Sequence, residues 1–220
     1  TLQAAKDVEL GSCARREVFR IDNVVLYRYQ GRTVVDNTVP VLIVYALVNR
    51  PDMADLQHDR SLIRSLLDRG LDIYLIDWGY PDGADRTLTL EDYIGRYIDA
   101  AVDFIANATG QERINLLGIC QGGTFSVCYS AMNPDKVRNL IATVTPIDFH
   151  TQDDMLSHLF RHVDIDLLVD SCGNISGDLL NMIFLSLKPF RLAQQKYVQM
   201  IDGLDDVEAT KMFLRMEKWI

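Results

Sequence analysis

Short apolar runs alternate with longer amphipathic stretches between residues 17 and 145. This alternation is typical of an α/β fold with a mostly parallel sheet. Several of the apolar runs are continuous, which favours strands that are buried on both faces. The predicted strands are Val18–Ile21, Val24–Tyr29, Val41–Tyr45, Leu71–Asp77, Ile114–Leu117 and Ile141–Val144. The first two predict a hairpin at one edge of the sheet, with Asp22 and Asn23 in its turn.

Three stretches between these strands have helical spacing. Apolar residues recur on one side of Arg60–Arg69 and of Glu91–Asn107, and a further helix is predicted over Gln121–Met132. Gly70 is suited to the C-cap of the first helix, and Thr89 to the N-cap of the second.

The pattern changes after residue 150, where the chain becomes helical, acidic and rich in leucine and methionine. Cys172–Asn174 and Lys188–Pro189 separate two or three predicted helices. We therefore expect an α/β core over residues 1–149 and a helical cap over residues 150–220. The run Leu179–Leu187 is too apolar for a helix that faces solvent. It is expected to be buried under the cap, to form a subunit contact or to line a hydrophobic entrance.

Composition narrows the class of protein. The 220 residues carry 31 acidic and 22 basic side chains, a net charge of −9, which argues against nucleic acid or an anionic membrane as the main partner. No apolar run is long enough to span a bilayer, and the first residues do not have the order of a signal peptide. The four cysteines form no C-x-x-C pair, so they are interpreted as reduced cytosolic thiols. The chain begins without Met and stops within an amphipathic stretch, so we expect a segment of a longer protein.

The motif Gly118-Ile119-Cys120-Gln121-Gly122-Gly123 follows an apolar strand and precedes a helix. This is the context of a nucleophile elbow, in which the nucleophile lies in a strained turn. The residues two before and two after it must then be small, and Gly118 and Gly122 occupy those positions. Cys120 is therefore the predicted nucleophile, at a helix N-terminus that favours a thiolate. The alternative is a structural cysteine in a glycine-rich turn.

The elbow also predicts an oxyanion hole. The main-chain amide of Gln121 would face the same space as Cys120. The second donor is expected from the loop after the earlier central strand, as the amide of Val48 or of Asn49, with Val48 preferred. The alternative is an ordinary strand-to-helix loop.

A general base is harder to find. His58 precedes the nucleophile and is interpreted as solvated. Asp148 and His150 are two residues apart, with little room for the histidine to fold back over Cys120. His158 and His162 have a spacing that could hold a metal, but no third ligand is evident, and no metal or cofactor is predicted. The predicted triad is thus incomplete.

The elbow resembles the cysteine lipase box of polyhydroxyalkanoate synthases. Further matching segments are Ala46–Pro51, Asp77-Trp78-Gly79, Leu90–Tyr93 and Thr145–Phe149. Glutamine after the cysteine and a short lead-in are most similar to the catalytic subunit of the two-component, class III enzymes. The resemblance covers residues 10–220 and implies an α/β-hydrolase core with a helical cap. It carries the family's nucleophile to Cys120, whereas the family's catalytic Asp and His follow the cap and have no counterpart here.

The resemblance implies an acyltransferase that polymerises (R)-3-hydroxyacyl-CoA, chiefly 3-hydroxybutyryl-CoA, through a thioester on Cys120. It also implies a homodimer, a second synthase subunit of the PhaE type, and a cytoplasmic location at the surface of polyester granules. We expect these 220 residues alone to be inactive, and an exposed sheet edge to promote association.

Two other functions are compatible with the residues. A cysteine α/β-hydrolase, similar to dienelactone hydrolase or a thioesterase, shares G-x-C-x-G and would release free acid. A non-catalytic assembly module would use the apolar cap to recruit a partner. Loss of turnover in Cys120→Ala would distinguish the enzymes from the module.

Overall fold

The computed structural model describes residues 11–31, 38–151 and 155–187, with the isolated positions 198, 201, 210 and 213. The described residues fall into two compact units. The core unit ends at Ile147, and the second unit starts at Asp148.

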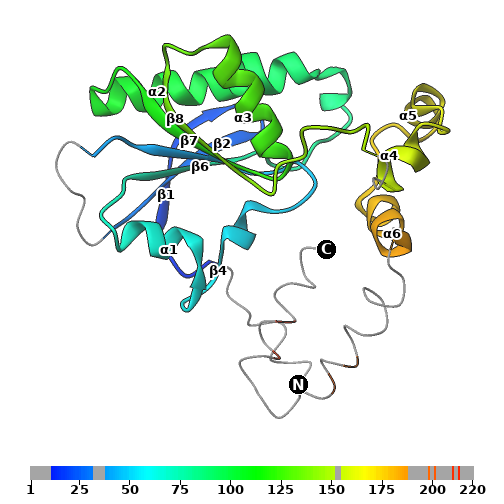
Figure 1. Ribbon diagram of the computed structural model, residues 1–220, viewed down its shortest axis with the longest axis horizontal. Coiled ribbons are helices and arrows are strands. Elements are labelled where there is room, and N and C mark those ends of the chain that lie inside the picture. Colours follow the sequence, from blue (N-terminus) through cyan, green and yellow to red (C-terminus); the bar gives the residue numbers. More distant parts are fainter. Residues whose placement is uncertain are drawn as a thin grey trace. The chain divides into compact units, whose positions relative to one another are not determined.

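A six-stranded sheet forms the centre of the core unit (Figure 1). Its strand order is β1-β2-β6-β3-β7-β8. The strands are β1 (Arg15–Ile21), β2 (Val24–Tyr29), β3 (Val41–Val44), β6 (Ile73–Asp77), β7 (Ile114–Ile119) and β8 (Val137–Thr143). The β1–β2 pair and the β2–β6 pair are antiparallel, and the other pairs are parallel. The carboxyl ends of β6, β3 and β7 therefore meet at one edge, where α/β proteins place their sites.

The apolar strands are buried on both faces, as the continuous runs predict. Along β3, Leu42 and Val44 join one hydrophobic cluster, while Val41 and Ile43 join another on the opposite face. Along β6, Tyr74 and Ile76 alternate with Ile73 and Leu75 in the same way. The period-2 geometry of a strand thus divides one apolar run between two cores.

Helices cover both faces of the sheet (Figure 1). α1 (Leu62–Leu67) packs Ile63 and Leu67 on one face. The π-helical segment η3 (Asp92–Ile98) continues into α2 (Asp99–Thr109), and both pack on the other face with α3 (Gln121–Met132).

The start of α1 differs from the prediction. The helix begins at Leu62 instead of Arg60, because the hydroxyl of Ser61 accepts the amide of Arg64 at 2.9 Å and caps it. The two residues before Leu62 form β5 (Arg60–Ser61), which pairs with β4 (Asp55–Gln57) in a small hairpin. Two 3₁₀ turns, η1 (Pro51–Ala54) and η2 (Asp85–Thr87), complete the core unit.

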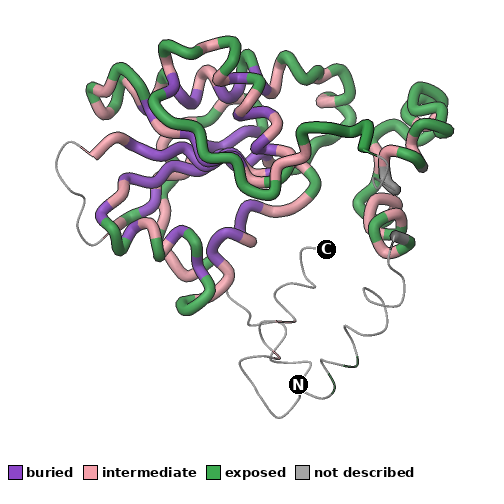
Figure 2. Tube along the Cα trace, viewed as in Figure 1, coloured by how far each residue is buried: buried purple, intermediate pink, exposed green. Residues whose placement is uncertain are grey.

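Strand β8 is the edge of the sheet, and it begins four residues earlier than predicted. Val137 is buried, but the other six residues of β8 are exposed, including Leu140 and Ile141 (Figure 2). An edge strand with apolar residues in solvent is a template for pairing with another strand. The expected association of the chain through this edge stays a prediction.

The second unit is helical in its described part, with α4 (Met155–Phe160), α5 (Ile165–Cys172) and α6 (Gly177–Leu187). Gly173 ends α5 with a φ of 69°, at the predicted break. Lys188–Pro189 lies outside the described residues. Along α6, half-buried residues are mixed with exposed ones such as Met182 and Phe184. No helix in the described ranges is long and apolar enough to cross a membrane.

Candidate active site

Cys120 lies in a sharp turn between β7 and α3. Its backbone has φ 55° and ψ −127°, a conformation that residues with a side chain rarely adopt. Such a residue costs about 1–3 kcal/mol and persists where the surrounding structure enforces it. The predicted elbow geometry is therefore present at Cys120.

Close packing around the turn explains its glycines. A Cβ atom on Gly118 would lie 2.8 Å from the hydroxyl of Ser126, and one on Gly122 would lie 2.5 Å from the carbonyl oxygen of Tyr45. The latter contact is with main chain, which cannot move aside easily. Gly122 thus lets the first turn of α3 rest directly on the end of β3.

The segment after β8 supports the elbow from the other side. The amide of Cys120 donates to the carbonyl of Thr143 at 3.0 Å. Gly123 leaves space for the Thr145 side chain, and the Thr124 hydroxyl donates to the carbonyl of Pro146 at 2.7 Å. The first two residues of the Thr145–Phe149 segment, which resembles the synthases, therefore support the elbow.

The Cys120 side chain is exposed at the N-terminus of a 12-residue helix. At this end of a helix the main-chain amides point outward and the helix dipole is positive. Burial, together with the nearby Cys120, raises the pKa of the Tyr45 hydroxyl. Burial raises the pKa of the Cys13 thiol, which makes Cys13 a poorer nucleophile.

Cys128 lies eight residues after Cys120 on the same helix, a position that predicts a core residue, but its side chain is exposed. The buried residues of α3 are Gly122, Gly123, Phe125, Ser126 and Tyr129, and Cys128 lies outside that set.

Gln121 connects the elbow to the loop after β3. Its carboxamide oxygen accepts a hydrogen bond from the amide of Leu47 at 3.1 Å. Val48, the next residue, lies in that loop with 47% of its surface exposed. The two predicted oxyanion donors, the amides of Gln121 and Val48, thus belong to segments that this hydrogen bond joins.

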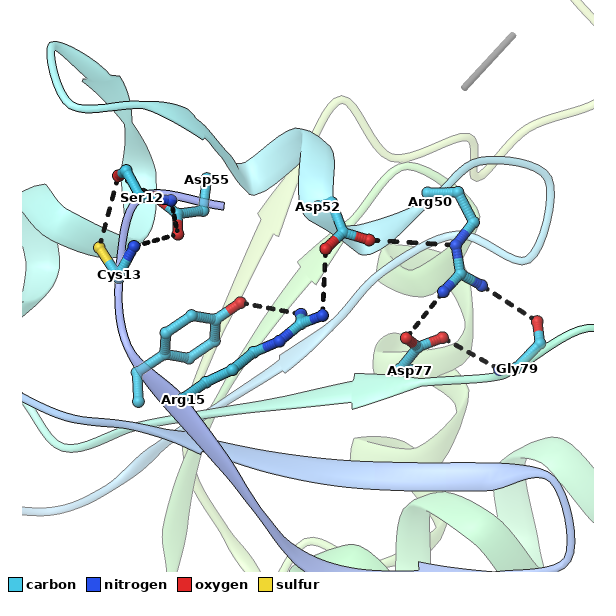
Figure 3. Close-up of polar contacts among 9 residues, drawn as sticks. Ser12, Cys13, Arg15, Arg50, Asp52, Asp55, Asp77 and Gly79 are labelled. Carbon is cyan, nitrogen blue, oxygen red and sulfur yellow. Dashed lines mark hydrogen bonds and ion pairs between the residues drawn. The ribbon is translucent and has the colours of Figure 1, made fainter. Parts of the chain in front are cut away.

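Two further side chains hold the loop after β3. The guanidinium of Arg50 pairs with Asp77 at 2.8 Å and donates to the carbonyl of Gly79 at 3.2 Å (Figure 3). The indole of Trp78 donates to the carbonyl of Tyr45 at 2.9 Å. Both anchors follow β6, the strand next to β3 in the sheet.

Charged groups extend this arrangement away from the elbow. Asp52 faces Arg15 at 3.1 Å (Figure 3). Nearby, the buried Asp55 accepts hydrogen bonds from the amides of Ser12 and Cys13, both at 2.8 Å, and from the Ser12 hydroxyl at 2.6 Å. These contacts fix the chain before β1 to the start of β4.

A small cleft opens beside the anchored loop. It has a volume of about 120 Å³ and includes Leu47, Trp78, Leu88, Tyr93 and Tyr97 among its lining residues. Leu47 therefore has two roles, because its amide binds Gln121 and its side chain lines the cleft.

All four histidines are described, and His58 is the one that belongs to the core unit with Cys120. His58 lies in the turn between β4 and β5, where it is exposed. In the second unit, His150 and Asp148 face each other at 3.8 Å, and both are exposed. His158 and His162 are exposed, and no group of metal ligands exists among the described residues.

Sequence reasoning missed the Gln121–Leu47 hydrogen bond and the Arg50 anchor. The residues involved lie in segments that the sequence analysis singled out, Ala46–Pro51 and Asp77-Trp78-Gly79. The motif spacing gave no signal for contacts between them, because each joins residues at least 27 positions apart.

Comparisons with known proteins agree with this geometry. Residues 39–216 match the family model described as the alpha/beta hydrolase fold. The poly(3-hydroxyalkanoate) polymerase subunit PhaC of Allochromatium vinosum is 58% identical over 218 residues, which are 98% of this chain and 61% of that protein. PhaC of Thiocystis violacea is 55% identical over 217 residues, with the same coverage. The chain thus spans 61% of the length of each relative.

A solved structure supports the fold alone. The Francisella virulence factor BioJ is 15% identical, with a TM-score of 0.50 over 70% of this chain and 50% of that one. The predicted resemblance to polyhydroxyalkanoate synthases is confirmed by the PhaC relatives, and the predicted fold class by the family model. Since that model spans most of the sequence and the sheet and elbow have the matching geometry, the chain belongs to the alpha/beta hydrolase fold family.

Proposed function

We propose that the protein is an acyltransferase that polymerises (R)-3-hydroxyacyl-CoA, chiefly 3-hydroxybutyryl-CoA, into polyhydroxyalkanoate and releases coenzyme A. The proposal is carried by one observation, a cysteine at the strained elbow of a chain that is 58% identical to a PhaC polymerase subunit. By the same resemblance, we infer that it works as a homodimer with a second synthase subunit, at the surface of cytoplasmic polyester granules. We also propose that residues 1–149 form the core and residues 150–220 form the cap.

Cys120 is the proposed nucleophile. Its thiolate attacks the thioester carbonyl, and the amides of Gln121 and Val48 stabilise the oxyanion that forms. The bond from carbon to the sulfur of coenzyme A then breaks, and coenzyme A leaves as a thiol after it takes up a proton. The product is a new thioester on Cys120.

The choice of cysteine suits polymerisation. Exchange of one thioester for another is nearly balanced in free energy, so the acyl group stays activated. The 3-hydroxyl of the next unit can then attack it, which forms an ester and frees Cys120. An ester on serine would be more stable and would favour hydrolysis over chain growth.

Product identity tests the proposal. The complete natural polypeptide that contains these residues is incubated with (R)-3-hydroxybutyryl-CoA, and free coenzyme A, insoluble polyester and free 3-hydroxybutyrate are measured. We expect polyester and coenzyme A from the wild type and from Cys128→Ala, the matched control on the same helix, and neither from Cys120→Ala. Free acid in place of polyester would indicate a hydrolase. A protein that releases no coenzyme A but binds a partner would indicate an assembly module.

A further inference from the structure

The side chain of Gln121 stands out because it reaches across the fold. Its carboxamide oxygen lies 3.1 Å from the amide nitrogen of Leu47, a residue 74 positions earlier in the chain. Gln121 itself is half-buried as the first residue of α3. The contact joins the turn that carries the nucleophile to the loop that carries the second predicted oxyanion donor.

Further contacts hold both segments at this junction. Gly122 packs against the carbonyl of Tyr45, and the indole of Trp78 holds that same carbonyl at 2.9 Å. Arg50 fixes the far end of the loop through Asp77 and Gly79. Between these anchors, Leu47 and Val48 are placed by the hydrogen bond that the Leu47 amide donates to the Gln121 side chain.

We propose that the Gln121 carboxamide is a positioning residue for the oxyanion hole. Its main-chain amide supplies one donor. Its side-chain oxygen accepts from the Leu47 amide and holds the Ala46–Leu47 peptide, the unit directly before the Leu47–Val48 peptide that carries the second donor. Oxyanion donors act only when they are held where charge develops, because reorientation during the reaction costs part of their benefit. This inference rests on the proposed role of Cys120 as an acyl-accepting nucleophile.

Two reactions of the same thiolate separate positioning from nucleophilicity. Attack on p-nitrophenyl acetate passes through an oxyanion before the bond from carbon to nitrophenolate breaks. Attack on iodoacetamide displaces iodide from a methylene carbon and forms no oxyanion. The ratio of the two rate constants at one pH cancels the fraction of thiolate, and it therefore reports the oxyanion hole alone.

Acylation and alkylation of Cys120 are both measured by mass spectrometry of the tryptic peptide that contains this residue. Cys128 lies on the same peptide between Arg113 and Lys136, so all variants carry Cys128→Ser. Gln121→Met keeps the length of the side chain and removes the acceptor, and Gln121→Asn is too short to reach Leu47. Gln121→Glu keeps an acceptor oxygen. Gln57→Met, in the β4–β5 hairpin, is the matched control, because its amide also makes one hydrogen bond, to Asp59.

We expect Gln121→Met and Gln121→Asn to lower the ratio of acylation to alkylation about 10- to 100-fold, below the full loss of a donor. Gln121→Glu should keep more of the wild-type ratio than Gln121→Met, although its carboxylate repels the oxyanion, and Gln57→Met should keep the wild-type ratio. An unchanged ratio in Gln121→Met, or an equal fall in both reactions, would overturn the inference. p-Nitrophenyl acetate contains no coenzyme A. A wild type that is acylated by this ester but forms no polyester would therefore contradict the proposed function, while the effect of the Gln121 variants on the ratio would still hold.

Discussion

Cys120 occupies a conformation that glycine adopts with less strain than any other residue. The positive φ of 55° costs about 1–3 kcal/mol for a residue with a Cβ atom. The surrounding contacts, from Gly118 and Gly122 to the carbonyl of Thr143, hold it there. The strain is the cost of an exposed sulfur at the helix N-terminus.

A pair of substitutions measures this strain. Cys120→Gly should be more stable than Cys120→Ala by about 1 kcal/mol, because relief of strain exceeds the extra chain entropy of glycine. At Cys128, an exposed helical site, the order should reverse by about the same amount. Urea unfolding of the four variants checks both signs. If Cys120→Gly has a lower free energy of unfolding than Cys120→Ala, the turn at Cys120 is not strained.

At the scale of elements, side chains join the ends of β6 and β3 to the start of α3. Trp78 connects β6 to the end of β3, Gln121 connects α3 to the loop after β3, and Arg50 connects that loop to β6. Arg50 and Asp77 are both largely buried, with side chains 18% and 7% exposed. Removal of one partner therefore leaves a charge without its counter-ion.

Arg50→Met should lower the free energy of unfolding by about 2–4 kcal/mol, because Asp77 stays buried without its partner. Arg20→Met breaks a pair of similar length with Glu17, but that pair is half-exposed and screened by solvent, so its loss should change stability little. Urea denaturation at pH 7 compares the two. Equal losses of unfolding free energy in the two variants would show that the buried Arg50–Asp77 pair contributes no more to stability than the half-exposed pair.

Asp55 predicts a dependence of stability on pH. Burial by itself would raise its pKa, but hydrogen bonds from the Ser12 and Ser61 hydroxyls and the amides of Cys13 and Ser12 lower it overall. A lowered pKa in the folded state stabilises the fold above the unfolded-state value near 4, and this contribution is lost as pH falls through the folded-state value.

Asp55→Asn should therefore cost about 2–4 kcal/mol at pH 7, since the amide cannot accept all of these hydrogen bonds. The difference from wild type should narrow below about pH 4. Asp59→Asn, on the exposed turn beside it, is the control and should be nearly neutral. Unfolding curves at pH 7 and pH 3.5 test this. If the difference in free energy of unfolding between Asp55→Asn and wild type is the same at both pH values, ionisation of Asp55 is not its cause.

Prediction from sequence succeeded where local chemistry decides the structure. Continuous apolar runs identified β3 and β6, and Thr89 caps its helix as predicted, since its hydroxyl accepts the amide of Asp92 at 3.4 Å. The π-helical turn of η3 and the β4–β5 hairpin were not predicted, because tertiary packing and not local spacing selects them. At the candidate site, G-x-C-x-G predicted the strained turn at Cys120, but the side-chain links of Gln121 and Arg50 depend on how distant strands are placed.

At the scale of the whole molecule, the core unit combines the exposed Cys120 of the elbow with a sheet whose β8 edge is exposed. The second unit adds helices with exposed apolar residues and the remaining three histidines. The chain spans 61% of the length of its PhaC relatives, which are named as polymerase subunits. The elbow, where we propose that acyl groups are attached, lies in the part of the chain that the structure describes.

The most direct test is the intact mass of the protein after brief incubation with (R)-3-hydroxybutyryl-CoA. We predict the mass of at least one hydroxybutyryl group on the wild type and on Cys128→Ala, removable by hydroxylamine as expected of a thioester. Cys120→Ala should carry none. An adduct that persists in Cys120→Ala, or a wild type that stays unmodified while coenzyme A is released, would contradict a covalent thioester at the elbow.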